Sequence, residues 1–350
     1  MKPIFLATLG LAISACASAP QPDGKSPIAA TPEIEQEVTI KGLRSVIVSV
    51  SDIDRTLAFY GGAIDLDVVS RYQLDGDHFH GGLLSEPADQ IDVALVRLPN
   101  TYMKLIDFEP DQDEAGTPRP LTGPGYTHIC FKSPATDSAF DKFDAAGLSA
   151  VSRGGVPVDL LGAGTEYFYG RDLDGTMIEI EIDQRPRRED AYWIGHVANV
   201  TPDIDRMVGF YETLIGYPVR RRAALSGSAR ADEISDIDSV SMKGAWFALN
   251  NIELEFWQFE NPVTPARTEP AKLDKIGYAG IAFEVTDLAN EIDRLEGHGV
   301  TFIGEPTMEL GWKTIFAYDP DGTLFALEQN ISAPQEESID DMIWIDPETF

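Results

Sequence analysis

The chain has 350 residues, of which 43% are hydrophobic, so it is long enough to bury a sizeable core. Acidic residues outnumber basic residues by 58 to 27, which gives a formal net charge of −31. Because nucleic acids and anionic lipid surfaces bind clustered lysines and arginines, this charge argues against both as partners and is typical of a solvated acidic surface.

The N-terminal segment is typical of an export signal. Residues 1–16, MKPIFLATLGLAISAC, combine an early lysine, an apolar stretch too short to span a bilayer as a stable helix, and small residues before Cys16. The ISAC ending resembles a bacterial lipobox, which implies a signal peptide that is cleaved before a lipidated Cys16. Ala17, in place of an aspartate, implies an outer-membrane lipoprotein on the periplasmic side, attached to the membrane only through its lipid. An ordinary secretory signal cleaved near Ala19 is the alternative.

The segment after the signal is predicted to be a flexible tether. Residues 17–38 are rich in proline, alanine and serine and show no hydrophobic periodicity. Cys130 is the only other cysteine in the sequence, so lipidation of Cys16 would leave no pair for an intramolecular disulfide. Because Cys130 lies in the apolar run HICF, we expect it to be a buried strand residue.

The remainder of the chain is an internal duplication. A shift of 151 positions aligns SVIVSVSDIDR, which starts at Ser45, with HVANVTPDIDR, which starts at His196. A shift of 152 positions aligns GYTHICF, from Gly125, with GYAGIAF, from Gly277. Each half of the duplication therefore contains two similar units, and the chain contains four.

Each unit is predicted to have the same elements in the same order. An apolar strand such as RSVIVSV comes first, and an aspartate such as Asp52 follows at the N-cap of a helix. Ile53, Leu57 and Tyr60 lie on one face of that helix. Three strands complete the unit, and a DLDG or DPDG turn precedes the last strand of units two and four. We therefore predict an α+β fold in which each of the four units is one βαβββ module.

The duplication also predicts the domain boundaries. Residues 39–186 contain modules one and two, and residues 190–331 contain modules three and four. Residues 332–350 form an acidic C-terminal tail outside the pattern, which we expect to dock loosely.

Two recurring motifs resemble those of a known superfamily. DIDR followed by a Phe–Tyr pair, and D-x-D-G-T-x-x-E before a last strand, resemble the vicinal oxygen chelate superfamily over roughly residues 39–331. That superfamily includes glyoxalase I, methylmalonyl-CoA epimerase, extradiol dioxygenases, and bleomycin and fosfomycin resistance proteins. The resemblance implies two curved mixed sheets, each made from two modules. A sheet of this kind cups a divalent metal, and each module offers one residue early in its first strand, often histidine, and one glutamate in its last strand.

Carried over module by module, this pattern selects four metal-ligand candidates. Modules two and three each offer a histidine and a glutamate, whereas modules one and four offer neither. The candidates are His128, Glu179, His196 and Glu255, and the corresponding positions of modules one and four hold Ser45, Lys104, Gly280 and Ala326. Glu181 and Glu253 lie two residues from the chosen glutamates, on the same strand faces, and remain alternatives.

The four candidates can bind one ion only if modules two and three share a sheet. Two imidazole nitrogens and two carboxylates suit Zn, Ni, Co, Mn or Fe(II). If consecutive modules paired instead, Lys104 would face Glu179 and His128, and its ammonium could replace the metal as the counter-charge. Both pairings are open at this point, and the second would leave the protein without a metal.

The resemblance implies three functions in order of preference. The first is a metal-dependent glyoxalase- or epimerase-like lyase or isomerase that acts on a small oxygen-chelating substrate through an enediolate, with Glu179 or Glu255 as the catalytic proton carrier. The second is a non-catalytic small-molecule-binding protein of the bleomycin-resistance type. The third, an extradiol-type dioxygenase, is less favoured because module four lacks both ligands.

Residues near the candidates suggest weaker features. His78 and His80, in DGDHFH, are expected in a loop. Trp257 and Phe259 flank Glu255, and we expect them to pack between helix and sheet, with the lining of an apolar pocket as the alternative.

We expect the substitution Cys16→Ser to move the protein from the membrane fraction to the soluble fraction without changing its fold, because the tether separates the lipid from the folded part. Fractionation of cells and circular dichroism of the purified proteins measure this. Cys130→Ser, the matched control, should stay with the membrane. A Cys16→Ser variant that fractionates like the parent would contradict the lipobox assignment.

Overall fold

The computed structural model describes residues 37–109, 118–133, 139–183 and 192–342. Cys16, the tether up to residue 36 and the last eight residues of the predicted tail lie outside these ranges. Within them, no helix is both long enough and apolar enough to cross a membrane.

The elements follow the predicted order of strand, helix and three strands, with additions in the second and third units. Unit one contains β1 (Ile40–Ser49), α1 (Ile53–Ala63), β2 (Asp67–Asp75), β3 (Gln90–Arg97) and β4 (Tyr102–Glu109). Unit two contains β5 (Gly125–Ser133), α2 (Ala139–Ala146), β6 (Ser149–Ala150), the 3-10 helix η1 (Arg153–Gly155), β7 (Val158–Asp159), β8 (Thr165–Arg171) and β9 (Met177–Asp183). Unit three contains β10 (Trp193–Val200), α3 (Ile204–Ile215), β11 (Arg221–Ser226), α4 (Ala229–Ser235), β12 (Ser241–Ala248) and β13 (Glu253–Asn261). Unit four contains β14 (Gly277–Val285), α5 (Leu288–Gly297), β15 (Phe302–Glu309), β16 (Trp312–Tyr318) and β17 (Leu324–Asn330), followed by the short 3-10 helices η2 (Gln335–Glu337) and η3 (Ile339–Asp341).

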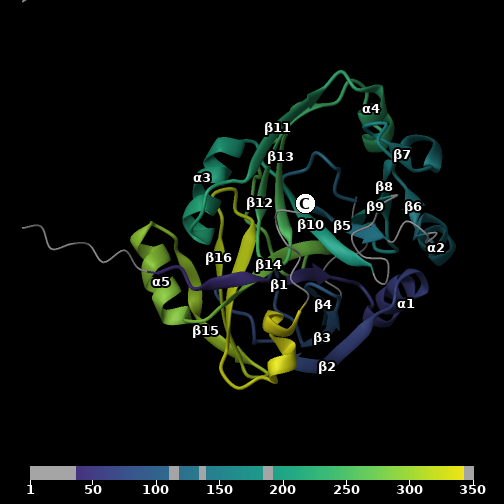
Figure 1. The fold of residues 1–350 in the computed structure, drawn as a ribbon. Coiled ribbons are helices and arrows are strands. Elements are labelled where there is room, and N and C mark those ends of the chain that lie inside the picture. Colours follow the sequence, from purple (N-terminus) through teal and green to yellow (C-terminus); the bar gives the residue numbers. More distant parts are fainter. Residues whose placement is uncertain (1–36, 110–117, 134–138, 184–191, 343–350) are drawn as a thin grey trace, which may run out of the picture. The chain divides into compact units, whose positions relative to one another are not determined.

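The strands form two curved mixed sheets, which confirms the predicted fold class (Figure 1). Sheet A has the order β15-β16-β17-β14-β1-β4-β3-β2, and sheet B has the order β11-β12-β13-β10-β5-β9-β8-β6, with β7 beside β8. β1 pairs with β14 and β5 pairs with β10, both antiparallel. Units one and four therefore share sheet A, and units two and three share sheet B. Each half of the duplication contributes to both sheets.

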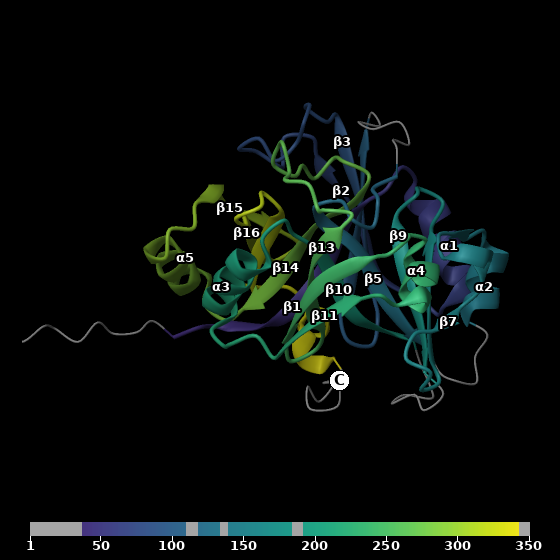
Figure 2. The same cartoon turned by 90° about the horizontal axis from the view of Figure 1, so that it is seen from above.

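Helices pack in pairs at opposite ends of the two sheets. Figures 1 and 2 both show α1 beside α2 and α3 beside α5. Phe59 of α1 and Phe143 of α2 have ring centroids 5.9 Å apart. Arg294 of α5 donates hydrogen bonds to the carbonyl oxygens of Thr213 and Leu214 in α3, at 2.7 and 2.8 Å. Each helix pair joins consecutive units.

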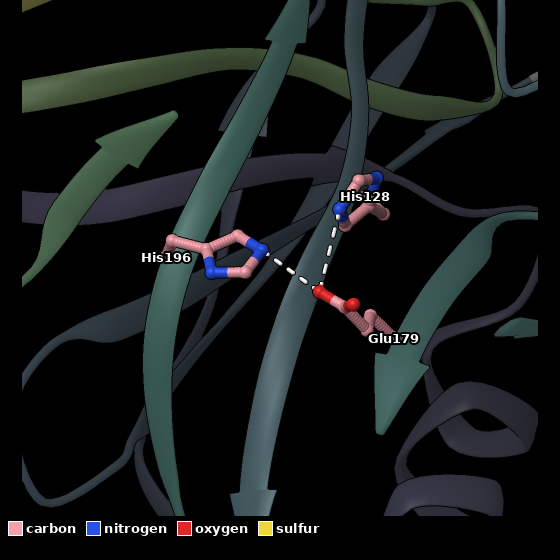
Figure 3. A group of neighbouring side chains, drawn as sticks. All are labelled: His128, Glu179 and His196. Atoms are coloured by element: carbon pink, nitrogen blue, oxygen red, sulfur yellow. Dashed lines mark ion pairs between the residues drawn. The ribbon is translucent and has the colours of Figure 1, made fainter. Parts of the chain in front are cut away.

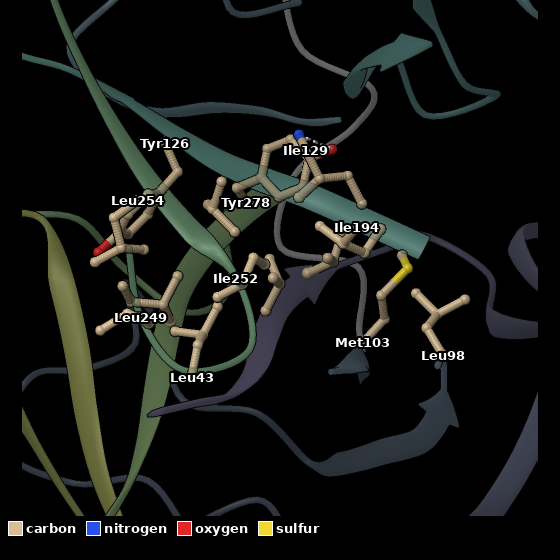
Figure 4. Close-up of a cluster of buried hydrophobic side chains, with 14 of the residues drawn as sticks. Leu43, Leu98, Met103, Tyr126, Ile129, Ile194, Leu249, Ile252, Leu254 and Tyr278 are labelled. Atoms are coloured by element: carbon tan, nitrogen blue, oxygen red, sulfur yellow. Dashed lines mark hydrogen bonds between the residues drawn. The ribbon is translucent and has the colours of Figure 1, made fainter. Parts of the chain in front are cut away.

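The main hydrophobic core contains side chains from both sheets. Leu43 and Met103 come from sheet A, and Ile129, Ile194 and Leu254 come from sheet B (Figure 4). All are nearly inaccessible to solvent. Burial of these side chains holds the two sheets against each other, since each removes apolar surface from water.

The repeated motifs DIDR…FY and D-x-D-G connect consecutive units across the two sheets. Asp52 caps α1 by accepting a hydrogen bond from the Arg55 amide at 2.9 Å, as predicted. The Tyr60 hydroxyl at the other end of α1 donates to Asp172 Oδ2 at 3.1 Å. Asp172 Oδ1 accepts from the amides of Asp174 and Thr176, which fixes the turn before β9.

The second half repeats this arrangement. Asp203 caps α3, and the Tyr211 hydroxyl faces Asp319 Oδ2 at 3.5 Å. Asp319 Oδ1 accepts from the amides of Asp321 and Thr323. The motifs that define the repeat in sequence thus serve as links between units that lie in different sheets.

A pair of buried asparagines, Asn100 and Asn251, completes the connection between the sheets. Asn251, between β12 and β13, binds both main-chain groups of Leu43 in β1, with N–O distances of 3.1 and 2.8 Å. Asn100, between β3 and β4, binds both main-chain groups of Ile194 in β10, at 2.8 and 3.1 Å. Each side chain also donates to the carbonyl oxygen of the other asparagine at 2.7 Å. This pair was not predicted from the sequence, although the shift of 151 positions aligns the two asparagines.

We expect Asn251→Ala to lower the free energy of unfolding by about 3 kcal/mol, because it leaves the buried amide of Leu43 without its side-chain acceptor and removes the donor to the carbonyl oxygens of Leu43 and Asn100, at about 1–3 kcal/mol for each buried group affected. The neighbouring Asn250 is exposed and makes one hydrogen bond, to the Lys41 carbonyl oxygen. Asn250→Ala is therefore the matched control and should cost about 1 kcal/mol or less. Urea unfolding of the three proteins decides this, and equal losses in the two variants would contradict the proposed role of Asn251.

Candidate metal centre

Four neighbouring strands of sheet B each place one of the predicted ligands on the same face. In the order β13-β10-β5-β9, these residues are Glu255, His196, His128 and Glu179. Ala198 in β10 lies opposite both Glu255 and His128. His196 is two residues from Ala198, so it lies on the same face of the strand.

The four side chains converge at one buried point. His196 Nε2 lies 2.8 Å from Glu179 Oε2 and 3.0 Å from Glu255 Oε2. His128 Nε2 lies 3.6 Å from Glu179 Oε2 and 3.9 Å from Glu255 Oε2 (Figure 3 shows three of the residues). One ligand atom each from His128, Glu179 and His196 lie within 4.8 Å of one another. The four pair distances are below about 4.4 Å, which is the span of two metal–ligand bonds.

The inward-facing atoms lack hydrogen-bond partners among the described residues. His128 Nε2, Glu179 Oε2, His196 Nε2 and Glu255 Oε2 are all buried, and none makes a hydrogen bond of acceptable geometry. Because buried polar atoms are almost always satisfied, four such atoms facing one point indicate a missing partner. Two nitrogens and two carboxylate oxygens fit a divalent transition metal, so this cluster could hold such an ion.

Outer contacts orient two of these ligands. The Trp246 indole Nε1 donates to Glu255 Oε1 at 2.7 Å, which leaves Oε2 facing the cluster. Trp246 lies opposite Glu255 in the β12–β13 ladder. The Thr127 hydroxyl lies 3.1 Å from His128 Nδ1, so Nε2 of that ring faces the cluster. Such contacts commonly fix the orientation of metal ligands. Trp246 was not predicted from the sequence, although it lies opposite Glu255 in the register of the β12–β13 hairpin.

The electrostatic field at this point favours a cation. Burial alone would lower the pKa of the His196 imidazole, but Glu255 and Glu179 raise it to about 9. Burial alone would raise the pKa of the Glu179 carboxyl, but His128 and His196 hold it well below its usual range. The carboxylates therefore stabilise positive charge at the centre of the cluster, and a divalent cation would experience the same field.

The alternative ligands Glu181 and Glu253 are paired with cations of the protein. Lys132 Nζ lies 2.7 Å from Glu181 Oε1, and Arg220 Nη1 lies 3.5 Å from Glu253 Oε1. Both glutamates border the cavity beside the cluster, but neither has an unpartnered buried oxygen. This distribution favours Glu179 and Glu255 over them as ligands.

The equivalent face of sheet A has no such cluster in the described residues. Lys104 forms an ion pair with Glu309 of β15, and His78 Nε2 lies 3.5 Å from Glu309 Oε2. Lys104 does not face Glu179, so the alternative based on consecutive pairing is wrong. Gly280 and Ala326 offer no donor atom. His78 and His80 lie in the loop between β2 and β3, as expected.

A cavity of about 520 Å³ opens beside the cluster in sheet B. Glu179, His196 and Glu255 form part of its wall. Trp257 and Phe259 also border it, so they line an apolar pocket, contrary to our expectation that they would pack between helix and sheet. The ring centroids of Trp257 and His128 are 5.2 Å apart. A small molecule in this cavity could reach the carboxylates directly.

Comparison with known proteins agrees with this fold. The model of the Glyoxalase/Bleomycin resistance protein/Dioxygenase superfamily matches residues 42–180 and 193–327. Glyoxalase I from Zea mays is similar in structure, with a TM-score of 0.58 and 17% identity over 83% of this chain and 92% of the maize chain. A putative dioxygenase from Bacillus subtilis gives a TM-score of 0.56 and 13% identity over 89% of this chain and 95% of its own. No curated protein matches the sequence. At identities this low, the likeness concerns the fold, and the reaction has to be argued from the site.

We expect His128→Ala and His196→Ala to lower the affinity for a divalent metal by similar factors, about a hundredfold or more, because each removes one ligand of the same ion. Titration of the metal-free protein with Ni²⁺, Co²⁺ or Zn²⁺ measures this.

The matched control is Ser45→Ala, at the sheet A position that aligns with His196. The Ser45 hydroxyl is buried without a hydrogen-bond partner, so its loss should be tolerated. If only one of the two histidine variants lost affinity, or if Ser45→Ala did as well, the four residues would not form one site.

Proposed function

The chain belongs to the Glyoxalase/Bleomycin resistance protein/Dioxygenase superfamily, and on this premise we propose that it is a metal-dependent lyase or isomerase that moves a proton at a carbon next to a carbonyl group. The observation that carries this proposal is the convergence of His128, His196, Glu179 and Glu255, each with a buried atom that makes no hydrogen bond, beside a cavity that three of them border. The proposed substrate is a small molecule with two neighbouring oxygens.

The site supplies two kinds of group that such a reaction needs. A divalent metal held by the four side chains would act as a Lewis acid toward the substrate oxygens. A carboxylate beside the same oxygens can take a proton from the adjacent carbon and return it. Both Glu179 and Glu255 border the cavity, so either can reach a bound molecule.

We assign the proton transfer to Glu179 and a constant ligand role to Glu255. The Trp246 indole fixes the outer oxygen of Glu255, so this carboxylate is held in one orientation. A group that alternates between binding and proton transfer needs freedom to turn, which the contact with Trp246 restricts. Glu179 is therefore the better candidate for the proton carrier.

The donor set also separates this proposal from an oxygenase. Non-haem iron oxygenases commonly use two histidines and one carboxylate, with open positions for oxygen and substrate. This cluster offers a second carboxylate, which suits proton transfer. A non-catalytic binding role would use the same cavity without turnover, and it is an outcome of the test below.

We expect the metal-loaded protein to exchange the carbon-bound proton of a suitable α-hydroxycarbonyl compound with deuterium from heavy water. A panel of small α-hydroxycarbonyl compounds, followed by proton NMR, measures the exchange. Glu179→Gln should slow it by about a hundredfold or more, because the amide cannot accept the proton. Glu166→Gln, on the neighbouring strand β8 and outside the cavity lining, is the matched control and should exchange at the parental rate.

The other outcomes distinguish the alternatives. Binding of the compounds without exchange would favour a sequestering protein. Oxygen uptake on catechols by the Fe(II)-loaded protein would favour a dioxygenase. If exchange persists in Glu179→Gln but disappears in a Glu255→Gln variant that still binds the metal, Glu255 is the proton carrier and Glu179 the constant ligand.

We further propose that the protein acts outside the cytoplasm, on the basis of the signal-like residues 1–16. Glutathione is scarce there, so the proposed substrate is not a glutathione adduct.

A further inference from the structure

The loop between the second and third strands of a unit occurs in equivalent form in units one and three. The shift of 151 positions aligns residues 76–89, between β2 and β3, with residues 227–240, between β11 and β12. The two loops have the same length, yet they lie differently on their sheets. This difference contributes to how much space each sheet leaves beside its central strands.

In unit one the loop fills the concave face of sheet A. Phe79 and Leu83 are buried among side chains of that sheet, and the Phe79 ring lies 6.0 Å from the ring of Phe316. The space that remains beside Lys104 and Glu309 is only about 10 Å³. Sheet A therefore has no room for a ligand at this place.

In unit three the loop forms the helix α4, which borders the cavity of sheet B on one side and does not fill it. The Ser152 hydroxyl, next to η1, donates to the carbonyl oxygen of Ile234 at 2.8 Å. Arg153 pairs with Asp236 and Asp238 at 2.8 and 2.9 Å. These contacts tie α4 of unit three to the η1 segment of unit two. The two outer parts of sheet B are thereby joined above the cavity.

The part of the cavity beneath α4 is apolar. Ala231 and Ile234 of α4 border it, together with Leu225, Val240 and Phe259. These five residues belong to one hydrophobic cluster, which continues through Trp257 to the ring of His128. A ligand that binds at the cluster of histidines and glutamates would therefore have an apolar chamber beside it.

The cations near the chamber are engaged with other groups of the protein. Lys132 pairs with Glu181 and Arg220 with Glu253. The Arg221 guanidinium lies over the Trp246 ring, 3.9 Å from its centroid. Because Lys132 and Arg220 are paired with carboxylates and Arg221 stacks on an indole, the chamber favours an uncharged group over an anionic one.

We propose that α4 determines the specificity of this site and that the ligand is an oxygen chelator with an uncharged apolar tail, alkyl or aryl, that lies beneath α4. This inference rests on the proposed function for the chelating end of the ligand, whereas the chamber is a property of this chain's own α4. At about 520 Å³, the cavity has the size of ordinary small-molecule sites.

The test uses n-alkyl hydroxamates, from acetohydroxamate to octanohydroxamate, as unreactive chelators on the full chain loaded with Co²⁺. We expect affinity to rise by about fourfold for each methylene that enters the chamber. The cobalt absorption spectrum and tryptophan fluorescence report binding. Equal affinity for all tail lengths would overturn the proposal.

Two variants test the place of the tail. Ala231→Trp should fill the chamber and reduce octanohydroxamate affinity about tenfold or more, while acetohydroxamate affinity stays unchanged. Ala229 is exposed on the same helix, so Ala229→Trp is the matched control and should bind both compounds like the parent. If Ala231→Trp fails to fold, Ala223→Trp replaces it, because Ala223 borders the cavity from an exposed position in β11. Equal losses for both hydroxamates would place the tail elsewhere.

A metal-free arm separates this inference from the proposed function. Octanamide has a similar tail but is a poor chelator, and it should quench or shift tryptophan fluorescence at concentrations where acetamide does not. If the protein takes up no metal but binds octanamide, and Ala231→Trp abolishes that binding, the proposed chamber stands and the proposed reaction is refuted. A protein that binds metal but does not distinguish the amides or the hydroxamates would refute the chamber alone.

Discussion

The antiparallel pairing of β5 with β10 is the constraint on which the candidate metal centre depends. It joins unit two to unit three and places His128 opposite Ala198, so that His196 falls on the same face. The parallel partners β9 and β13 then add Glu179 and Glu255 from the two sides. If these two units were in different sheets, each would keep one histidine and one glutamate, which is too few ligands for a stable transition-metal site.

The two sheets balance their buried charges in different ways. In sheet A, the ammonium of Lys104 neutralises the buried carboxylate of Glu309 within the protein. In sheet B, the position that aligns with Lys104 holds Glu255, and the carboxylates face imidazoles. A buried carboxylate is costly without a compensating cation, so this cluster favours a proton or a metal ion at its centre. The duplication thus produced one sheet that supplies its own cation and one that can accept a cation from solution.

Separate sets of contacts hold consecutive units and distant units together. Tyr60 with Asp172, and Tyr211 with Asp319, connect neighbouring units, whereas strand pairing connects units one and four and units two and three. Asn100 and Asn251 then bind main-chain groups of the opposite sheet. The described part of the chain from residue 37 onward belongs to one compact unit. The cavity wall in sheet B is therefore supported by the whole chain fold, including the sheet that has no cluster.

The sequence by itself determined the repeated strand–helix order, because hydrophobic periodicity, the N-cap aspartates and the D-x-D-G turns are local signals. The resemblance to the superfamily's ligand pattern singled out His128, Glu179, His196 and Glu255, and the shift of 151 positions, which aligns Lys104 with Glu255 as well as Ser45 with His196, supported the register. Only the tertiary structure decided which units share a sheet, since apolar edge strands of similar units can pair in either way. Only the tertiary structure showed the cavity as well, because two loops of equal length make different long-range contacts: Phe79 packs on sheet A, whereas the segment that contains α4 is bonded to the distant residues Ser152 and Arg153.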